Sequence, residues 1–238
     1  YKYLFYKASE IFRAYGITVF ITVVGTAASL FITPLLAYPL SRKDFKARNI
    51  FSFLVFFTML FNGGIVPSYI MWTRIFHLKN TITALILPGL LMNGFNVILM
   101  KNYFAQNIPA ELIEAAKMDG AGEFKIFFKM ILPLSLPIMA TVGLFVGIGY
   151  WNDWTNGLYY VTDAKLYSLQ NLLNRILQDV QFLNSSTMTN AGVAATTQMP
   201  SVSIRMAISV VGILPIMVLY PFFQKYFVKG IAVGAVKG

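Results

Sequence analysis

Five long stretches of the sequence contain no Asp, Glu, Lys or Arg. They hold 28, 25, 21, 23 and 19 residues, and lie between Arg13 and Arg42, Arg48 and Arg74, Lys79 and Lys101, Lys129 and Asp153, and Arg205 and Lys225. A helix needs about 20 mostly apolar residues to cross roughly 30 Å of hydrocarbon. Because lipid offers the backbone no hydrogen-bond partners, each stretch must satisfy its own N–H and C=O groups. The pattern predicts five membrane-spanning α-helices.

Composition agrees with a membrane protein. Hydrophobic residues make up 57 % of the chain and charged residues 12 %, whereas a soluble domain carries about a quarter charged residues. We therefore expect one all-α transmembrane domain over residues 1–238. The lack of cysteine excludes disulfides and thiol catalysis, and the single histidine, His77, argues against a protein-bound metal. The net charge of +10 is assigned to loops that face anionic lipid or cytoplasm, not to nucleic acid.

The distribution of Lys and Arg predicts the orientation. Segments 41–49, 101–130 and 224–238 hold 11 basic residues in 54, against 8 in 77 for segments 1–13, 72–80 and 151–205. The denser set is expected on the cytoplasmic side, which places the C-terminus inside and Tyr1 outside. No Met or signal peptide precedes the first span, so we expect one further upstream helix and six spans in the native protein.

The cytoplasmic segment 104–131 is predicted to form a short helix pair. Asn107 suits an N-cap, Pro109 suits the first turn, and Glu111 lies near the positive end of the helix dipole. Asp119-Gly120 favours a turn. A second amphipathic helix is expected from about Gly122, with its aromatic residues near one face: Phe124, Phe127 and Phe128. On periodicity alone, the pair is equally consistent with an interfacial anchor that binds lipid headgroups.

A sequence motif distinguishes these alternatives. The run Glu114-Ala115-Ala116, followed after three residues by Gly120 and then by Leu132-Pro133, resembles the EAA loop of ABC-importer permeases; only Met130 departs from that pattern. The resemblance implies a type I ABC-importer transmembrane domain whose coupling helices dock into a cytoplasmic ATPase. It implies that Glu114 pairs with a basic residue of the ATPase. The residues assigned to ATPase coupling are Glu111, Glu114, Ala115, Ala116, Asp119, Gly120 and Pro133.

Further motifs resemble the carbohydrate branch of this family. Asp119-Gly120-Ala121, Leu132-Pro133-Leu134 and Trp151-Asn152-Asp153 are similar to relatives of the smaller maltose-permease subunit. The stretches 62–67 and 220–227 are similar to a poly- and oligosaccharide subgroup that includes alginate and pectin-fragment systems. The resemblance implies import of an oligosaccharide or polysaccharide across the cell membrane of a bacterium. An importer of another solute class and a non-transport membrane scaffold protein remain the alternatives.

Two groups of residues are candidates for lining the solute path. Asn62, Asn93 and Asn96 interrupt the second and third stretches, and such amides either bind sugar hydroxyls or join helices. Tyr150, Trp151 and Asn152 end the fourth stretch, where aromatic residues either stack on sugars or form an interfacial belt. No stretch holds an ionisable residue, which argues against proton or sodium coupling and favours energy supplied from outside the membrane.

The segment 151–205 is expected to be an external loop that contains one amphipathic helix, because six apolar residues recur there at helical spacing: Leu169, Leu172, Leu173, Ile176, Leu177 and Val180. Asn184 to Thr197 is expected to be irregular. We expect no catalytic residue, metal or cofactor on this chain. The resemblance implies that ATP and Mg²⁺ bind to a partner ATPase dimer, and that a second, homologous permease subunit and a solute-binding protein complete the transporter.

Overall fold

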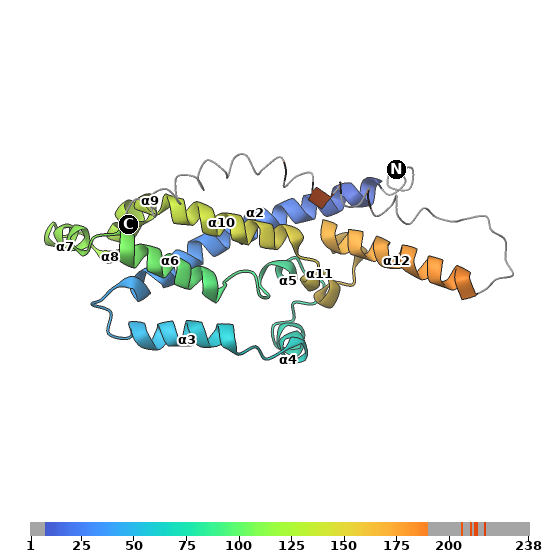
Figure 1. Ribbon diagram of the computed structural model, residues 1–238, viewed down its shortest axis with the longest axis horizontal. Coiled ribbons are helices and arrows are strands. Elements are labelled where there is room, and N and C mark those ends of the chain that lie inside the picture. The colour runs from blue at the N-terminus through green and yellow to red at the C-terminus, as the bar shows by residue number, and fades with distance from the viewer. Residues whose placement is uncertain (1–7, 190–205, 207–209, 211, 214–216, 218–238) are drawn as a thin grey trace. The chain divides into compact units, whose positions relative to one another are not determined.

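A computed structural model describes residues 8–189 and residues 206, 210, 212, 213 and 217. All regular structure within these residues is helical (Figure 1), which confirms the all-α prediction. The chain divides into two compact units. One comprises Tyr1–Thr22, Tyr69–Pro88 and Ile148–Tyr220, and the other comprises Val23–Ser68, Gly89–Gly147 and Pro221–Gly238. The boundary of a single domain over 1–238 stays a prediction.

The first charge-free stretch forms one long helix, α2 (Ala8–Ser41). Its residues Ser9–Ser41, 33 in number, are long and apolar enough to cross a membrane. At 1.5 Å per residue the helix is about 50 Å long, more than the thickness of the hydrocarbon core. Large apolar side chains such as Val23 and Phe31 are 62 % and 57 % exposed, as expected for a surface that faces lipid.

The second stretch is a broken helix. α3 (Arg48–Leu60) is followed by a bend of 111° and by α4 (Ile65–Ile70), which continues into the π-helix η1 (Met71–Ile75). Gly64 has a φ of +86° at the break, and its N–H donates to Asn62 Oδ1 at 2.9 Å. The interruption of this stretch predicted at Asn62 is confirmed. The helix ends here because Gly64 adopts a left-handed conformation that no α-helix continues.

The third stretch also contains two separate helices, α5 (Thr83–Ile86) and α6 (Gly94–Asn107). Gly89, at φ +72°, lies in the connection. Asn93 caps α6, because its side chain accepts a hydrogen bond from the N–H of Phe95 at 2.9 Å. A single span over this stretch is therefore not what the described residues form.

Before the fourth stretch lies α7 (Ala110–Met118), which is followed by α8 (Glu123–Ile126). The π-helix η2 (Phe127–Ile131) and α9 (Leu132–Leu134) then lead, through a bend of 79°, into α10 (Leu136–Asn152). α10 packs closely on α2, since a Cβ at Gly143 would lie 3.1 Å from Leu30 Cδ1. Small residues at a contact between helices permit such close packing.

The number of spans stays a prediction. Among the described residues, one helix is long and apolar enough to cross a membrane, and up to three spans result if each bent pair counts as one. The fifth predicted span, residues 206–224, lies almost entirely outside the described residues.

The segment after α10 forms α11 (Thr155–Tyr160), the short 3₁₀-helix η3 (Ala164–Leu166) and α12 (Leu169–Thr189). The predicted amphipathic helix is confirmed, and it buries Leu169, Leu172, Leu173 and Ile176 in one cluster with Ala14 and Trp151. Residues 184–189, which were expected to be irregular, continue this helix. Residues 190–197 lie outside the described residues.

Candidate functional site

The turn between α7 and α8 ends α7 in a Schellman motif. Gly120 has a φ of +74°, its N–H donates to Lys117 O at 3.0 Å, and the N–H of Ala121 donates to Ala116 O at 2.9 Å. These two bonds satisfy carbonyls that the helix end leaves free. The turn predicted at Gly120 is confirmed. The N-cap is Pro109; the prediction of Asn107 is wrong by two residues, because α6 extends through Asn107 and the chain is extended at Ile108 and Pro109.

The two faces of α7 differ in exposure. Ile113 and Ala116 are each 8 % exposed and pack inward. The opposite face is exposed, with Met118 at 89 %, and it comprises Glu111, Glu114, Ala115 and Met118. Asp119, Gly120 and Pro133 are also exposed. Of the seven residues predicted to couple to an ATPase, only Ala116 faces the interior of its own unit.

Four charged side chains connect this helix pair to the end of α2. Arg42 Nε donates to Asp44 Oδ1 at 2.9 Å and Arg42 Nη2 pairs with Asp44 Oδ2. Arg42 Nη1 lies 3.4 Å from Glu123 Oε2. Lys117 Nζ lies 2.8 Å from Glu123 Oε1 and 3.4 Å from Asp44 Oδ2. Positive and negative groups thus alternate around a closed circuit, and we call Arg42, Asp44, Lys117 and Glu123 the charged ring.

Tyr38, in the last turn of α2, ties the ring to that helix. Its hydroxyl donates to Glu123 Oε2 at 3.2 Å and accepts from Arg42 Nη1 at 2.8 Å. Below the hydroxyl, the Tyr38 ring packs against Phe127 and Phe104, with centroids 5.4 and 6.5 Å away. A cavity of about 400 Å³ adjoins the charged ring. Its lining residues include Leu35, Pro39, Phe45 and Phe124.

The ring shifts the ionisation of its members. The hydrogen bond from Arg42 lowers the pKa of Asp44 from its ordinary value to about 2. The hydrogen bond to Glu123 raises the pKa of Lys117. Both groups are therefore ionised at neutral pH. The side chains of Asp44, Lys117 and Glu123 are 58 %, 39 % and 54 % exposed, so each pair contributes little to stability, about 0–1 kcal/mol.

Sequence reasoning did not find the ring. Its members are 73 to 81 positions apart across the two segments, and no local pattern pairs residues at such distances. One signal was present. Asp44 is the only acidic residue in the basic cluster of residues 42–48, and Lys117 and Glu123 flank the Gly120 turn.

The residues predicted to line a solute path lie at several places. Asn62 and Asn93 cap backbone turns, and Asn96 is buried. In the other unit, Tyr150 is fully buried and its hydroxyl donates to Ile86 O at 2.8 Å. Trp151 Nε1 donates to Gly212 O at 3.1 Å, and Asn152 is exposed. Four of these residues, Asn62, Asn93, Tyr150 and Trp151, make hydrogen bonds within their own unit, and a role toward solute stays a prediction for all six.

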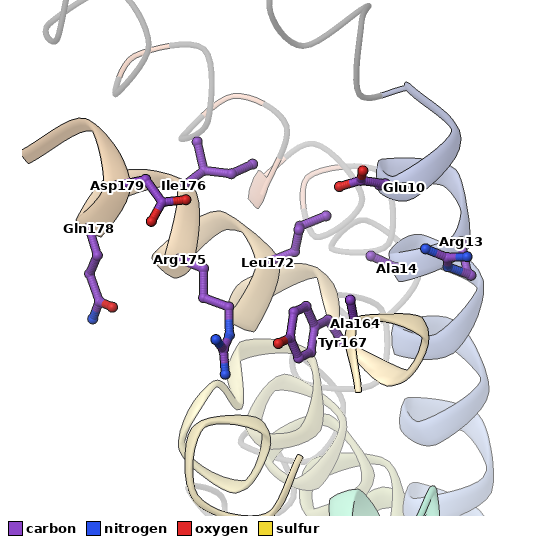
Figure 2. Close-up of a pocket in the computed structure, with 10 residues that line it drawn as sticks. All are labelled: Glu10, Arg13, Ala14, Ala164, Tyr167, Leu172, Arg175, Ile176, Gln178 and Asp179. Carbon is purple, nitrogen blue, oxygen red and sulfur yellow. The ribbon is translucent and has the colours of Figure 1, made fainter. Parts of the chain in front are cut away.

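A second cleft, of about 410 Å³, lies between the start of α2 and α12 (Figure 2). Glu10 and Arg13 line it from α2, and Arg175 and Asp179 line it from α12. The Arg175 guanidinium lies 4.3 Å from the centre of the Tyr167 ring, and its Nε donates to Asn171 Oδ1 at 2.9 Å. The cleft therefore combines guanidinium groups with an aromatic ring, groups that suit a polar ligand.

No group of three or more His, Asp or Glu side chains able to hold a metal ion occurs among the residues that the structure describes. None of the geometry above constitutes a nucleophile with its base. The arrangement is an exposed helix face, that of α7, held at the end of a long helix.

The comparisons with known proteins agree with this architecture. The family model described as binding-protein-dependent transport system inner membrane component matches residues 12–233. The chain is 44 % identical over 240 residues to Protein LplC of Bacillus subtilis (strain 168), covering 100 % of this chain and 78 % of that protein. It is 42 % identical over 240 residues to the polygalacturonan/rhamnogalacturonan transport system permease protein YtcP of the same organism, covering 100 % and 81 %.

A solved structure is similar as well. It is the crystal structure of a bacterial ABC transporter involved in the import of the acidic polysaccharide alginate. One of its chains is 35 % identical to this chain, with a TM-score of 0.76, and the match covers 92 % of this chain and 75 % of that chain.

Proposed function

Because this chain belongs to the family of binding-protein-dependent transport system inner membrane components, we propose that it forms half of the solute pathway of an importer of oligosaccharides or polysaccharides. Members of the family are transport permeases of the membrane, and ATP hydrolysis resides in a separate subunit, so this chain is not an enzyme. The proposed localisation is the cell membrane of a bacterium, with the C-terminus and α7 on the cytoplasmic side.

The exposed face of α7 is the observation that supports this function most directly. Glu111, Glu114, Ala115 and Met118 share one face at helical spacing, and none of them is used to pack this chain. We assign this face to a cleft of the ATPase, where Glu114 meets a basic residue and Ala115 allows close approach. Ala116 supports α7 from behind, and Gly120 sets the direction in which the pair projects.

The mechanism is alternating access. ATP binding closes the ATPase pair, the closure displaces α7 and α8, and the helices of two homologous permease subunits rearrange to open toward a docked solute-binding protein. ATP and Mg²⁺ bind to the ATPase in this scheme. The permease supplies the docking surface, the pathway and the rigid helices that connect them.

We further propose that the solute is acidic. YtcP is named for polygalacturonan and rhamnogalacturonan, and the solved relative imports alginate, an acidic polysaccharide. In this chain the cleft that contains Arg13, Tyr167 and Arg175 also contains Glu10 and Asp179, so its basic and acidic side chains balance, and the support for an acidic solute comes from these two relatives. A relative at 32 % identity, AraQ of Halalkalibacterium halodurans, is named for arabinooligosaccharides. Neutral saccharides of this kind are therefore the solutes against which acidic ones are compared.

The test uses the complete transporter in liposomes, with both permeases, the ATPase and the binding protein. Oligomers of polygalacturonan or alginate are expected to be imported and to stimulate ATP hydrolysis more than arabinooligosaccharides do. Glu114→Arg is expected to weaken retention of the ATPase and to abolish uptake, whereas Lys125→Gln, at an exposed position of α8, leaves both intact. Stimulation by amino acids or phosphate instead would favour another solute class. A chain that retains no ATPase would favour a scaffold protein.

A further inference from the structure

The charged ring connects three parts of the chain that are distant in sequence. Arg42 directly follows the last residue of α2, and Asp44 lies in the turn that leads to α3. Lys117 lies in the last turn of α7, and Glu123 begins α8. These four residues therefore flank the Gly120 turn on one side and terminate α2 on the other. No residue of the exposed α7 face takes part.

We propose that the charged ring is the rigid link through which displacement of α7 and α8 moves the cytoplasmic end of α2, so that its four residues position the helix pair for energy coupling. The proposal rests on the coupling function proposed above for α7. It assigns to Arg42, Asp44, Lys117 and Glu123 a role apart from ATPase docking.

The geometry supports transmission of movement rather than simple attachment. Every member of the ring has two partners of opposite charge, so no member can leave without unpairing two others. A single exposed ion pair would rearrange or exchange with water, but a closed network that includes a planar guanidinium has a defined geometry. The Arg42 side chain is only 14 % exposed, which restricts its movement further.

A layer of packed aromatic side chains adjoins the charged ring. Tyr38 contacts the charged ring through its hydroxyl, and its aromatic side chain packs against Phe127, which directly follows α8. Tyr38 and Phe127 are 8 % and 3 % exposed. Two layers, one ionic and one apolar, thus join the same pair of elements. Tilting α8 requires either that α2 follows or that both layers break. Pro34 and Pro39 lie inside α2 near this end, so the ring holds the part of α2 in which prolines interrupt helix hydrogen bonds.

The experiment measures solute imported per ATP hydrolysed by the complete transporter in liposomes. Glu123→Gln and Lys117→Gln are expected to retain the ATPase and to hydrolyse ATP, but to import about fivefold less solute per ATP, the lower end of common coupling energies between sites. Matched controls are Lys43→Gln, between Arg42 and Asp44, and Lys125→Gln, between Glu123 and Phe127. Both lysines are exposed and lie outside the ring, and both variants are expected to retain the wild-type ratio.

A fully inverted ring tests the alternation of charge directly. The quadruple variant Arg42→Glu, Asp44→Lys, Lys117→Glu and Glu123→Arg restores opposite charges at every contact and keeps one guanidinium in the ring, and the Tyr38 hydroxyl can reverse its donor and acceptor roles. This variant is expected to recover most of the ratio lost by the single variants. Failure to recover would overturn the proposal, as would single variants with the wild-type ratio.

The docking function proposed for α7 and the role proposed for the charged ring are refuted by different results. Loss of the ATPase from Lys117→Gln or Glu123→Gln would overturn the ring proposal, because it would make these residues docking contacts. If the wild-type chain itself retained no ATPase, the proposed function would fail first. Intact retention with a reduced ratio, restored on inversion, is the result that only the ring predicts.

Discussion

Gly120 offers a clean test of how the turn orients α7, because a neighbouring glycine serves as its control. Gly120 has a φ of +74°, and a Cβ at this position would meet no atom within 4 Å. Gly122 also has open space for a Cβ, but its φ is −73°. Gly120→Ala and Gly122→Ala therefore add the same methyl group to the same turn without steric contact. They differ in the sign of φ, and Gly122 is in addition the N-cap of α8.

The magnitude follows from that difference. An L-residue in the left-handed region costs about 1–2 kcal/mol, whereas alanine at negative φ costs nothing in the folded state and restricts the unfolded chain. The N–H groups of Gly120 and Ala121 are held by Lys117 O and Ala116 O. Gly120→Ala is expected to speed hydrogen exchange of these amides about 5- to 30-fold, since 1.4 kcal/mol corresponds to a factor of ten.

The assay is hydrogen–deuterium exchange of the purified transporter, followed by mass spectrometry on peptides that cover residues 117–124. Gly120→Asn is expected to give a smaller increase than alanine, because asparagine tolerates the left-handed region. Equal acceleration in Gly120→Ala and Gly122→Ala would refute the reasoning, because the sign of φ would then not control the turn. An unchanged rate in both would show that the turn does not govern the protection of these amides.

Two further predictions concern pH and packing. The folded-state pKa of Asp44 is lowered to about 2. The ionised carboxylate therefore stabilises the ring fully at pH values above the ordinary pKa of Asp, and this stabilisation is lost only as pH falls from about 4 to about 2. Solute imported per ATP hydrolysed is measured for wild type and for Asp44→Asn. We expect the difference between the two proteins to stay constant from about pH 5.5 to 8, and a change near neutrality would contradict this. Gly157→Ala would place a Cβ 2.1 Å from Nδ2 of buried Asn171, so we expect a loss of about 1–3 kcal/mol and a lower melting temperature. Gly16→Ala, with nothing within 4 Å, is expected to leave that temperature unchanged or raised.

Local signals in the sequence were sufficient where one residue controls the backbone. The break at Gly64 and the turn at Gly120 both depend on positive φ, which glycine adopts without strain. The helix α12 was also predictable, because its apolar residues recur at helical spacing and the structure buries four of them in one cluster. In each case the determinant lies within a few residues of the feature that it produces.

Features that depend on distant residues were not predictable in this way. Hydropathy measures whether a stretch prefers lipid, but it carries no information about direction, so the bends of 111° and 79° did not appear in the charge-free pattern. The ring is a second example. Arg42 and Glu123 meet because α2 and α8 pack through Tyr38 and Phe127, and this contact depends on tertiary structure. The N-cap at Pro109 was missed because Asn107 is the stronger local signal.

The π-helix η2 (Phe127–Ile131) lies between the Gly120 turn and α10, and it determines how an extra residue is accommodated in this connection. A π turn accommodates one residue more than an α turn, and each residue of an α-helix advances the side-chain direction by about 100°. Loss of one residue in this segment would convert it to an α-helix, and because the π turn takes up the extra residue, Glu123 and Ser135 would keep nearly the same relative direction about the helix axis. Loss of one residue from a segment that is already α-helical would instead turn Glu123 by about 100°. The π turn thus lets the connection between the Gly120 turn and α10 hold one extra residue without turning the exposed face of α7 or α8.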